Sequence, residues 1–410
     1  MGFLEQGRSS FGLMRNRPVA VITTMQLVRT MGRSMVWVFA PIYYADYYHI
    51  SFFTIGILFF LGTVITFPFG IYGGNIVDRL GRRSMGLLLP PLSAALFFAF
   101  ATTAFLRIGG LVSFVLFILI FPLADLEGIV DQVIVTDVVA EHERINAFSL
   151  NRIGANVGFS IGPALGGFLS IFGFGWPFLV PAFGSIVVFF VFLLYIVETK
   201  PRLDPSKRSA GGKRELFPRG DGRFLQVVII LSLISFVAGQ WGTTLTLFLS
   251  RGYHLSDQEI GLMYTLNGIV VILFQIPVNM ALSRWSDFSR LALGSLIYSS
   301  SFFLYSLSGV FAFVLLNTFY LTIGENVLAP VQTSIISKIS PEDRRGQYFG
   351  AYYSISGMIV PMAPLLGTYG LEFLINQGML FWGIFASGGL VLSIVGYLRL
   401  MSIYGKTAAQ

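Results

Sequence analysis

Long apolar runs separated by short polar stretches make up most of the chain. Each run is close to the ~20 residues that an α-helix needs to cross a bilayer. The runs fall at about residues 18–44, 51–73, 84–106, 110–136, 147–172, 177–197, 224–250, 259–282, 291–308, 310–337, 348–371 and 378–401. This pattern predicts an all-α integral membrane protein with twelve transmembrane helices.

The composition also indicates a membrane protein. Of the 410 residues 55% are hydrophobic, and only 11% are charged, against about 25% in soluble domains. Glycine is frequent, at 45 residues, as expected where membrane helices pack closely through small side chains. Cysteine is absent, which excludes disulfides, thiolate nucleophiles and cysteine-ligated metals.

The positive charges predict how the chain is oriented. A net charge of +7 could suggest nucleic-acid binding, but the cations gather in the short segments of one side. With the N-terminus inside, all but four Lys and Arg residues fall in cytoplasmic segments; the exceptions are Arg29, Arg33, Arg107 and Arg251. Both termini are therefore predicted to be cytoplasmic. The first apolar run is too long for a signal peptide, so we expect it to remain as a helix.

One long polar segment divides the chain. Residues 198–223 are rich in Lys and Arg and contain a Ser-Ala-Gly-Gly run, which is typical of a solvated linker. The sequence thus predicts an N-terminal six-helix bundle at 1–197, a cytoplasmic linker at 198–223 and a C-terminal six-helix bundle at 224–410.

The two halves repeat one another. Shifted by 209 residues, Pro277 falls on Pro68 and Asp287 falls on Asp78. Shifted by 201 residues, as the later helices require, Pro364 falls on Pro163, Gly367 on Gly166 and Arg345 on Arg144. Such a parallel repeat relates two bundles by a pseudo-two-fold axis along the membrane normal.

A short basic motif connects the second and third runs. Residues 74–83 read G-N-I-V-D-R-L-G-R-R. Its glycines suit a tight turn, and its arginines keep this side in the cytoplasm. Asp78 would accept hydrogen bonds from neighbouring cations or from the N-terminus of another helix. We expect a conformational latch made by Gly74, Asp78, Arg79, Gly81, Arg82 and Arg83, with Asp287 in the second half.

The spacing G-x-x-x-D-R-x-G-R-R resembles the signature loop of the major facilitator superfamily of secondary transporters. An ordinary cytoplasmic loop would explain the arginines but neither the aspartate nor the glycine spacing. The resemblance implies the major facilitator fold, with a substrate cavity between the two bundles that is lined by the first, fourth, seventh and tenth helices.

The fifth run carries a stripe of small residues. Its expected packing positions are Gly154, Gly158, Gly162, Pro163, Gly166 and Gly167. Glycines at four-residue spacing let a neighbouring helix approach backbone to backbone. The string G-F-S-I-G-P-A-L-G-G is similar to the fifth-helix motif of the drug/proton antiporter branch, which implies export; glycine packing common to the whole superfamily is the alternative. That branch usually has an arginine early in the fourth helix, whereas residues 114–121 here contain no basic residue.

Seven charged residues fall within or near predicted spans. Each would cost ~2.5–3.5 kcal/mol if it faced lipid at the bilayer centre, so they should face the interior, water or one another. The seven are Arg29, Arg33, Asp125, Glu127, Asp131, Arg152 and Glu325. Arg29 and Arg33 share one helix face, as do Glu127 and Asp131. We expect the two pairs to meet, either as a functional site or as a static bridge.

Four acids against three arginines leave one carboxylate over, and a buried unpaired carboxylate tends to take up a proton. The candidates for proton coupling are Glu325, Asp125, Asp131 and Glu127. Glu325 comes first because the tenth run has no basic residue, and Asp125 is its repeat counterpart to within one residue. A protonated carboxyl with only a structural role is the alternative.

Polar and aromatic residues of the helices predicted near the cavity would bind substrate. They are Arg29, Arg33, Gln26, Trp37, Gln240, Trp241, Asn267, Gln275, Asn317 and Tyr320. Aromatic rings bind apolar or cationic solutes. Tyr43, Tyr44, Tyr47 and Tyr48, at the outer end of the first helix, are expected in the interfacial belt instead. The three histidines have no partner at metal-ligand spacing, so we expect no metal site and no cofactor.

These features together favour a proton-coupled exporter of small amphipathic or cationic compounds, working by alternating access in the cell membrane. The alternative is a proton-coupled symporter of a small organic anion bound by Arg29 and Arg33. A channel or scaffold would explain neither the latch motif nor the intramembrane acids. No nucleophile and base pattern or phosphate-binding glycine loop indicates an enzyme. The expected partners are a small-molecule substrate, protons and the lipid bilayer, with no nucleic acid and a monomeric state.

Overall fold

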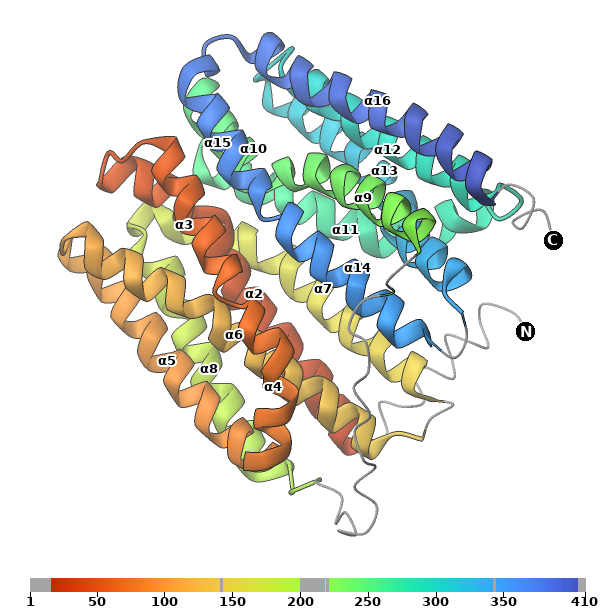
Figure 1. The fold of residues 1–410 in the computed structure, drawn as a ribbon. Helices are drawn as coiled ribbons and strands as arrows, with labels where there is room; N and C mark the ends of the chain where they lie inside the picture. Colours follow the sequence, from red (N-terminus) through yellow and green to blue (C-terminus); the bar gives the residue numbers. More distant parts are fainter. Residues whose placement is uncertain (1–15, 141–142, 200–217, 219–220, 342–343, 405–410) are drawn as a thin grey trace. The chain divides into compact units, whose positions relative to one another are not determined.

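A computed structural model describes residues 16–140, 143–199, 218, 221–341 and 344–404 (Figure 1). These residues form helices and contain no strand. The α-helices are α2 (Arg17–Tyr47), α3 (Phe52–Val64), α4 (Phe67–Leu80), α5 (Arg82–Leu106), α6 (Gly110–Val138), α7 (Arg144–Leu169), α8 (Gly175–Tyr195), α9 (Gly222–Ala238), α10 (Thr243–Leu247), α11 (Asp257–Ala281), α12 (Asp287–Tyr305), α13 (Phe311–Ile339), α14 (Arg345–Ile359), α15 (Met362–Leu374) and α16 (Gly378–Tyr404).

Ten helical stretches of the described chain are long and apolar enough to cross a membrane. The predicted first and ninth runs also form helices, α2 and α12, but lie outside these ten. Helix α2 carries Arg29 and Arg33 along its length, and α12 is short, with 19 residues. The all-helical membrane fold is confirmed for the described residues.

Three predicted runs are broken where the sequence analysis expects continuous helices. The second run divides into α3 and α4, with Pro68 in the first turn of α4. The eleventh divides into α14 and α15 at Pro361. The seventh passes from α9 through a short 3₁₀ segment (Gly239–Trp241) into α10. Proline is tolerated in the first helical turn because it lacks the N–H that later turns need.

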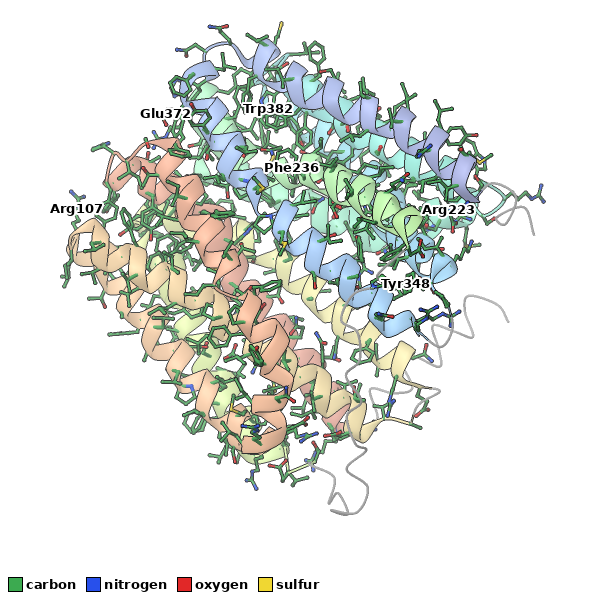
Figure 2. All side chains as sticks on the ribbon, in the orientation of Figure 1. Arg107, Arg223, Phe236, Tyr348, Glu372 and Trp382 are labelled. Carbon is green, nitrogen blue, oxygen red and sulfur yellow. The ribbon has the colours of Figure 1, made fainter. Side chains whose placement is uncertain are left out.

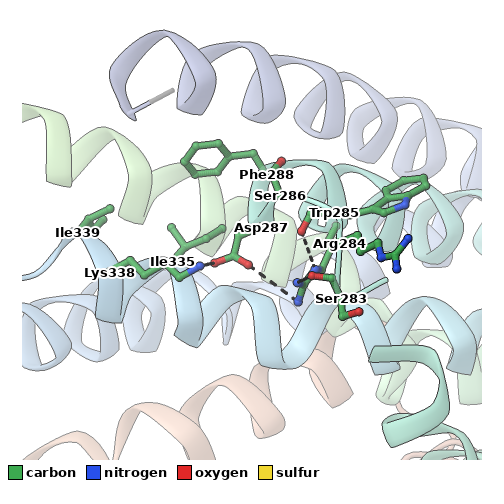
Figure 3. A pocket seen from close by; sticks show the side chains of 10 residues that line it. Ser283, Arg284, Trp285, Ser286, Asp287, Phe288, Ile335, Lys338 and Ile339 are labelled. Carbon is green, nitrogen blue, oxygen red and sulfur yellow. Dashed lines mark hydrogen bonds and ion pairs between the residues drawn. The ribbon is translucent and has the colours of Figure 1, made fainter. Parts of the chain in front are cut away.

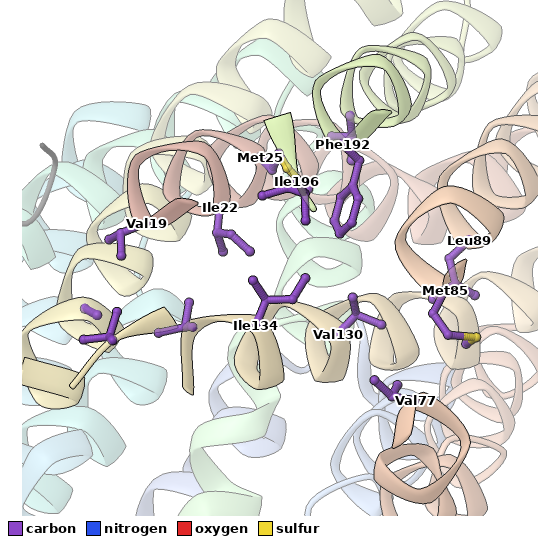
Figure 4. Packing of buried hydrophobic residues seen from close by; sticks show 14 of the residues in the cluster. Val19, Ile22, Met25, Val77, Met85, Leu89, Val130, Ile134, Phe192 and Ile196 are labelled. Carbon is purple, nitrogen blue, oxygen red and sulfur yellow. The ribbon is translucent and has the colours of Figure 1, made fainter. Parts of the chain in front are cut away.

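The first compact unit comprises Met1–His49, Leu61–Arg208 and Ser256–Gly268. In it α2 packs along α7 and α8, and α5 packs against α6 and α8. A buried apolar cluster joins α2, α6 and α8 through Ile22, Ile134 and Phe192 (Figure 4). Close van der Waals packing of this kind stabilises helices that share an apolar solvent.

The second compact unit comprises Ile50–Phe60, Ser209–Leu255 and Ile269–Gln410. In it α12 packs against α13 and α16, and α9 packs against α14 and α16. Trp382 of α16, which is labelled in Figure 2, is fully buried. It stacks on Phe302, with ring centroids 5.2 Å apart. Residues 50–60 belong to this second unit and residues 256–268 to the first. Most of the predicted linker, residues 200–217 and 219–220, lies outside the described residues.

The turn between α4 and α5 is narrower than predicted. Helix α4 continues to Leu80, and Gly81 makes the turn with φ of 93° while its N–H bonds to the Val77 carbonyl at 3.0 Å. Glycine suits this left-handed conformation because it has no Cβ. The prediction that Gly74 belongs to the turn is wrong, because Gly74 lies inside α4 and needs no special backbone geometry.

Candidate functional site

Four of the intramembrane charges of the first unit form a network between α2 and α6. Arg29 Nη1 lies 2.5 Å from Asp131 Oδ2, and Arg29 Nε lies 3.5 Å from Glu127 Oε2. Arg33 binds the same Oε2 of Glu127. Ser93 of α5 donates a hydrogen bond of 2.9 Å to the other oxygen, Glu127 Oε1. The two arginine–carboxylate pairs that helical spacing places on common faces therefore lie together.

The network is buried and electrically balanced. The side chains of Arg29, Glu127 and Asp131 are only 4%, 1% and 5% exposed, whereas that of Arg33 is 25% exposed. Two positive and two negative charges cancel, which offsets the large penalty of burying each alone. Within the described residues Asp131 Oδ1 is buried without a hydrogen-bond partner. Such an oxygen is a natural place for a proton or an ordered water.

An apolar pocket of about 170 Å³ borders this network. It lies between α2, α5 and α6 and is lined by Arg33, Val36, Trp37, Phe97, Phe117, Ile120, Phe121 and Ala124. Its volume is similar to the ~150 Å³ apolar cavity that can hold a benzene ring. Arg33 therefore contacts both a carboxylate network and a space that fits one aromatic ring.

The remaining intramembrane charges lie outside the network. Asp125 is exposed on α6. Arg152 is exposed on α7. Glu325, on α13 of the second unit, is half-buried. The surplus of carboxylates expected from the sequence thus comes from residues that the network does not enclose.

The proposed substrate-binding residues of the first unit differ in burial. Trp37 is partly exposed, lines the apolar pocket and lies edge-on to Tyr264, with centroids 5.8 Å apart. Gln26 is half-buried, whereas Asn267 is only 4% exposed. Among these three, only Trp37 lines the pocket.

Most of the corresponding residues of the second unit hold helices together. Gln240 is fully buried and donates to the Ala363 carbonyl at 3.1 Å. Asn317 is 3% exposed and donates to the Ser301 carbonyl at 2.9 Å. Trp241 is also buried, while Gln275 and Tyr320 are half-buried. The sequence could not separate such packing amides from binding amides, because both are polar residues within apolar runs.

The prediction that Tyr43 and Tyr44 lie in an interfacial belt is wrong. Both side chains are fully buried. The Tyr43 ring meets Phe178 at 5.1 Å, and the Tyr44 hydroxyl donates to the Ser113 carbonyl at 3.1 Å. Two adjacent tyrosines can be buried together because each ring packs among aromatic neighbours while the hydroxyl finds an internal partner.

The glycine stripe of α7 lies against α2. A Cβ added at Gly154 would stand 2.6 Å from the Thr23 carbonyl oxygen, and one at Gly166 would stand 2.7 Å from the Phe39 ring. Added Cβ atoms at Gly158 and Gly162 would overlap backbone atoms of α2 as well. Pro163 and Gly167 face α11 instead, where their neighbours are Gly261 and Asp257.

The latch motif is organised around Arg82. This guanidinium is 8% exposed and bonds Asp78 Oδ1 at 2.9 Å and Asp137 Oδ2 at 3.0 Å. Glu198 accepts from the backbone N–H groups of Arg82 and Arg83 at 3.1 and 3.2 Å, and so caps α5. Arg79 and Asp78 are exposed. The neighbouring cation expected for Asp78 is therefore Arg82.

The second copy of the motif has the opposite arrangement of charge (Figure 3). Asp287 at the start of α12 is 9% exposed and accepts from Lys338 Nζ at 2.7 Å and Ser334 Oγ at 2.8 Å. Arg290 Nη1 is 3.9 Å from its other oxygen. Here one carboxylate lies between two cations, whereas in the first motif one cation lies between two carboxylates.

Several residues of these sites were not expected from the sequence. Ser93, Phe97 and Phe117 border the network or the pocket, and Asp137 and Glu198 complete the latch motif. The two phenylalanines cannot be told apart from the rest of the 41 in the chain, and a single serine in an apolar run has no distinctive spacing. Only Asp137 has a signal in the sequence. Under a shift of 201 residues it aligns with another charged residue, Lys338, so both halves carry a charge at this position.

Comparisons with known proteins identify the family. The family model of the Major Facilitator Superfamily matches residues 22–256 and 227–406. A Na(+), Li(+), K(+)/H(+) antiporter of Planococcus maritimus is 24% identical over 95% of this chain and 97% of the relative. Multidrug resistance protein 1 of Bacillus subtilis is 25% identical over 78% of this chain and 81% of the relative. The crystal structure of the nucleoside transporter NupG has a TM-score of 0.77 at 13% identity, covering 93% and 99% of the two chains.

The family match covers nearly the whole chain, and the structural likeness shows the same fold. Members of this family move solutes across membranes and are not enzymes. The chain therefore belongs to the major facilitator superfamily and is a multi-pass secondary transporter of the cell membrane, with multidrug-resistance proteins and a cation/proton antiporter among its relatives.

Proposed function

We propose that this transporter is a proton-coupled exporter of small amphipathic or cationic compounds that works by alternating access. We further propose twelve transmembrane helices with both termini in the cytoplasm. The two six-helix bundles would be residues 1–197 and 224–410, joined by a cytoplasmic linker at 198–223.

The observation that carries this proposal is the contact of one side chain, Arg33, with both the apolar pocket and the ion network. The pocket suits an aromatic or aliphatic part of a substrate. Glu127 is bound by Arg33, whose side chain is partly exposed. A positively charged group of the substrate would displace Arg33 and pair with Glu127 in its place. A ligand with both parts is an amphipathic cation.

The charge balance supports exchange rather than co-transport. With Asp125 ionised, the network and its neighbour Asp125 carry a net charge of −1, since the acids Asp125, Glu127 and Asp131 face only Arg29 and Arg33. One added proton or one added monovalent cation neutralises the site. Adding both leaves an uncompensated positive charge in a medium of low dielectric, which is strongly unfavourable. Proton and cationic substrate should therefore exclude one another.

The proposed coupling carboxylates are Glu325 and Asp125, with Glu127 and Asp131 as the acids that hold the arginines. Glu325 lies on a helix whose membrane part contains no basic residue, and Asp125 is exposed to solvent or lipid rather than enclosed. Both positions leave the carboxyl group accessible to a proton. The other proposed substrate contacts are Arg29, Gln26 and Trp37, together with the half-buried Gln275 and Tyr320 of the second unit.

The organic-anion symporter is less well supported. Arg29 and Arg33 are already engaged by carboxylates, so an anionic substrate would have to displace Glu127 or Asp131. The relatives also favour the exporter over the symporter, since their names describe multidrug resistance and cation/proton antiport. Because one relative is an antiporter of alkali cations, any panel of test substrates must include alkali cations.

Transport into proteoliposomes under an imposed pH gradient tests the proposal. The panel should hold matched aromatic compounds that are cationic, neutral and anionic, together with Na⁺ and K⁺. We expect uptake of the cationic aromatic compounds against their own gradient only when the proton gradient is present. Arg33→Gln should disturb coupling more than binding, because it leaves Glu127 with fewer partners. Arg399→Gln, at the end of α16, removes an equal charge outside the site and is the control.

Binding of anions only, lost in Arg33→Gln, would establish the symporter instead. Uptake of Na⁺ or K⁺ without any aromatic compound would show that the apolar pocket plays no part in substrate choice.

A further inference from the structure

The second unit contains a pocket that the proposed transport cycle does not use (Figure 3). It has a volume of about 550 Å³ and is formed by the α11–α12 loop, the first turn of α12 and the last turns of α13. This volume lies within the ~300–1,000 Å³ range of small-molecule sites. The pocket is therefore large enough for a ligand rather than for water alone.

The side chains around the pocket leave an excess of positive charge. Arg284, Arg290 and Lys338 face one carboxylate, Asp287, so the lining carries a net charge of +2. Asp287 is nearly enclosed, at 9% exposure, by its bonds to Lys338 and Ser334. The Lys338 side chain is 68% exposed and its ammonium has further N–H donors, while Arg284 is exposed as well. The groups that the pocket exposes to a ligand are therefore positively charged.

The backbone of the pocket is held in place before any ligand binds. Arg290 donates from Nε to the Trp285 carbonyl and from Nη2 to the Ser283 carbonyl, both at 3.1 Å. Ser286 caps α12 by accepting from the Ser289 N–H at 3.1 Å. These bonds fix the loop against the start of α12, so a ligand need not order it.

Trp285 indicates the depth of the pocket in the membrane. Its side chain is 49% exposed in the loop that follows the spanning helix α11. Exposed tryptophan at the end of a spanning helix is typical of the level of lipid head groups. Basic pockets between helices at this level bind anionic head groups.

The equivalent corner of the first unit lacks this property. There Asp78 and Asp137 bond the Arg82 guanidinium, Glu198 accepts from the Arg82 backbone N–H, and Asp137 stands where a shift of 201 residues places Lys338. The three arginines of that motif, Arg79, Arg82 and Arg83, are balanced there by three carboxylates. The cationic pocket therefore belongs to the second unit and is not a general consequence of the repeated motif.

We propose that this pocket binds a phosphate group at the membrane surface, with Arg284 and Lys338 as its direct contacts. The head group of an anionic phospholipid and a free phosphate ion offer the same chemistry, and the test below separates them.

The full-length protein in a neutral detergent is titrated with phosphatidylglycerol and, separately, with inorganic phosphate, and bound ligand is counted by native mass spectrometry. The test variant is Arg284→Gln with Lys338→Gln. The matched control is Arg223→Gln with Arg399→Gln, which removes two exposed arginines of the same unit outside the pocket (Figure 2 labels Arg223). We expect the test variant to lose affinity for phosphatidylglycerol by about tenfold or more, since each cation near a membrane surface contributes to anionic lipid binding. The control should bind as the wild type does.

If binding of inorganic phosphate is also lost in the test variant and kept in the control, at similar concentrations, the free ion is the ligand. If only binding of phosphatidylglycerol is lost in this way, the lipid is the ligand. Arg284→Lys with Lys338→Arg keeps both charges and should keep binding, which guards against a fault in folding. Equal binding by the test and control variants would overturn the proposal. So would loss of binding in the charge-conserving variant when its thermal unfolding is unchanged.

Discussion

Arg29, Glu127 and Asp131 of the first unit are each no more than 5% exposed and bond to one another, whereas the buried polar side chains of the second unit's spanning helices are amides and hydroxyls. Typical contacts of the second unit are Asn317 to the Ser301 carbonyl and Tyr305 to Thr318, at 2.9 and 2.8 Å. Among the described residues, a buried ion network thus lies within the spanning helices of the first unit, whereas the buried polar contacts within those of the second are neutral hydrogen bonds.

The difference matters for transport because only ionisable groups respond to protons. A neutral hydrogen bond such as that of Asn317 keeps its geometry at any physiological pH, so it can hold a bundle rigid. A network of balanced charges is different, since adding a single proton leaves one arginine without its partner. We infer that the first unit senses proton and substrate, while Glu325 on α13 gives the second unit an ionisable group within a spanning helix.

Breaking the charged network should have the largest effect on stability. Arg29→Met leaves two buried carboxylates short of a partner and should lower the free energy of unfolding by about 3–5 kcal/mol. Asn317→Leu, its counterpart in the second unit, should lower it by only about 1 kcal/mol. Unfolding in detergent micelles measures both. Equal losses would show that the two bundles are held in the same way.

The double variant Arg29→Met with Asp131→Leu removes a whole pair and should be more stable than Arg29→Met alone. A lower free energy of unfolding in the double variant than in Arg29→Met would show that the unpaired carboxylates do not cause the loss of stability in Arg29→Met.

Gly162→Leu should have the next largest effect. A side chain there overlaps backbone and Ser34 atoms of α2, which cannot move aside, so the loss should be at least the usual ~1–3 kcal/mol of overpacking. Gly388→Leu on α16 is the control, because nothing lies within 4 Å of the added Cβ. Both are measured by thermal unfolding. Unchanged stability in Gly162→Leu would mean that α2 and α7 do not pack as described.

Asp78→Asn should change stability least. The Asp78 side chain is 61% exposed, so its pair with Arg82 should contribute no more than about 1 kcal/mol. If the motif is a latch, the variant should still raise cytoplasmic accessibility, seen as faster labelling of Gln26→Cys in a chain that has no other cysteine. Asp287→Asn, in the second motif, is the comparison. Unchanged labelling of position 26 in Asp78→Asn would exclude the latch.

The sequence predicts those features that depend on spacing within one helix. The apolar runs locate the helices, and four-residue spacing places Arg29 with Arg33 and Glu127 with Asp131, so their meeting requires only that α2 and α6 be neighbours. Features that depend on which helices touch are not predicted. Phe97 and Phe117 line the pocket and Tyr43 is buried because of neighbouring elements, and no local pattern distinguishes them from other aromatic residues.

The most direct test of proton coupling is accumulation of a cationic aromatic substrate in proteoliposomes under an imposed proton gradient, with wild type and Glu325→Gln side by side. Glutamine keeps the volume and hydrogen bonding of a protonated glutamate but cannot ionise. We expect Glu325→Gln to bind substrate and to exchange it down its gradient, yet to accumulate none. Accumulation equal to that of the wild type would contradict this account of Glu325 and would move the coupling to Asp125 or Asp131.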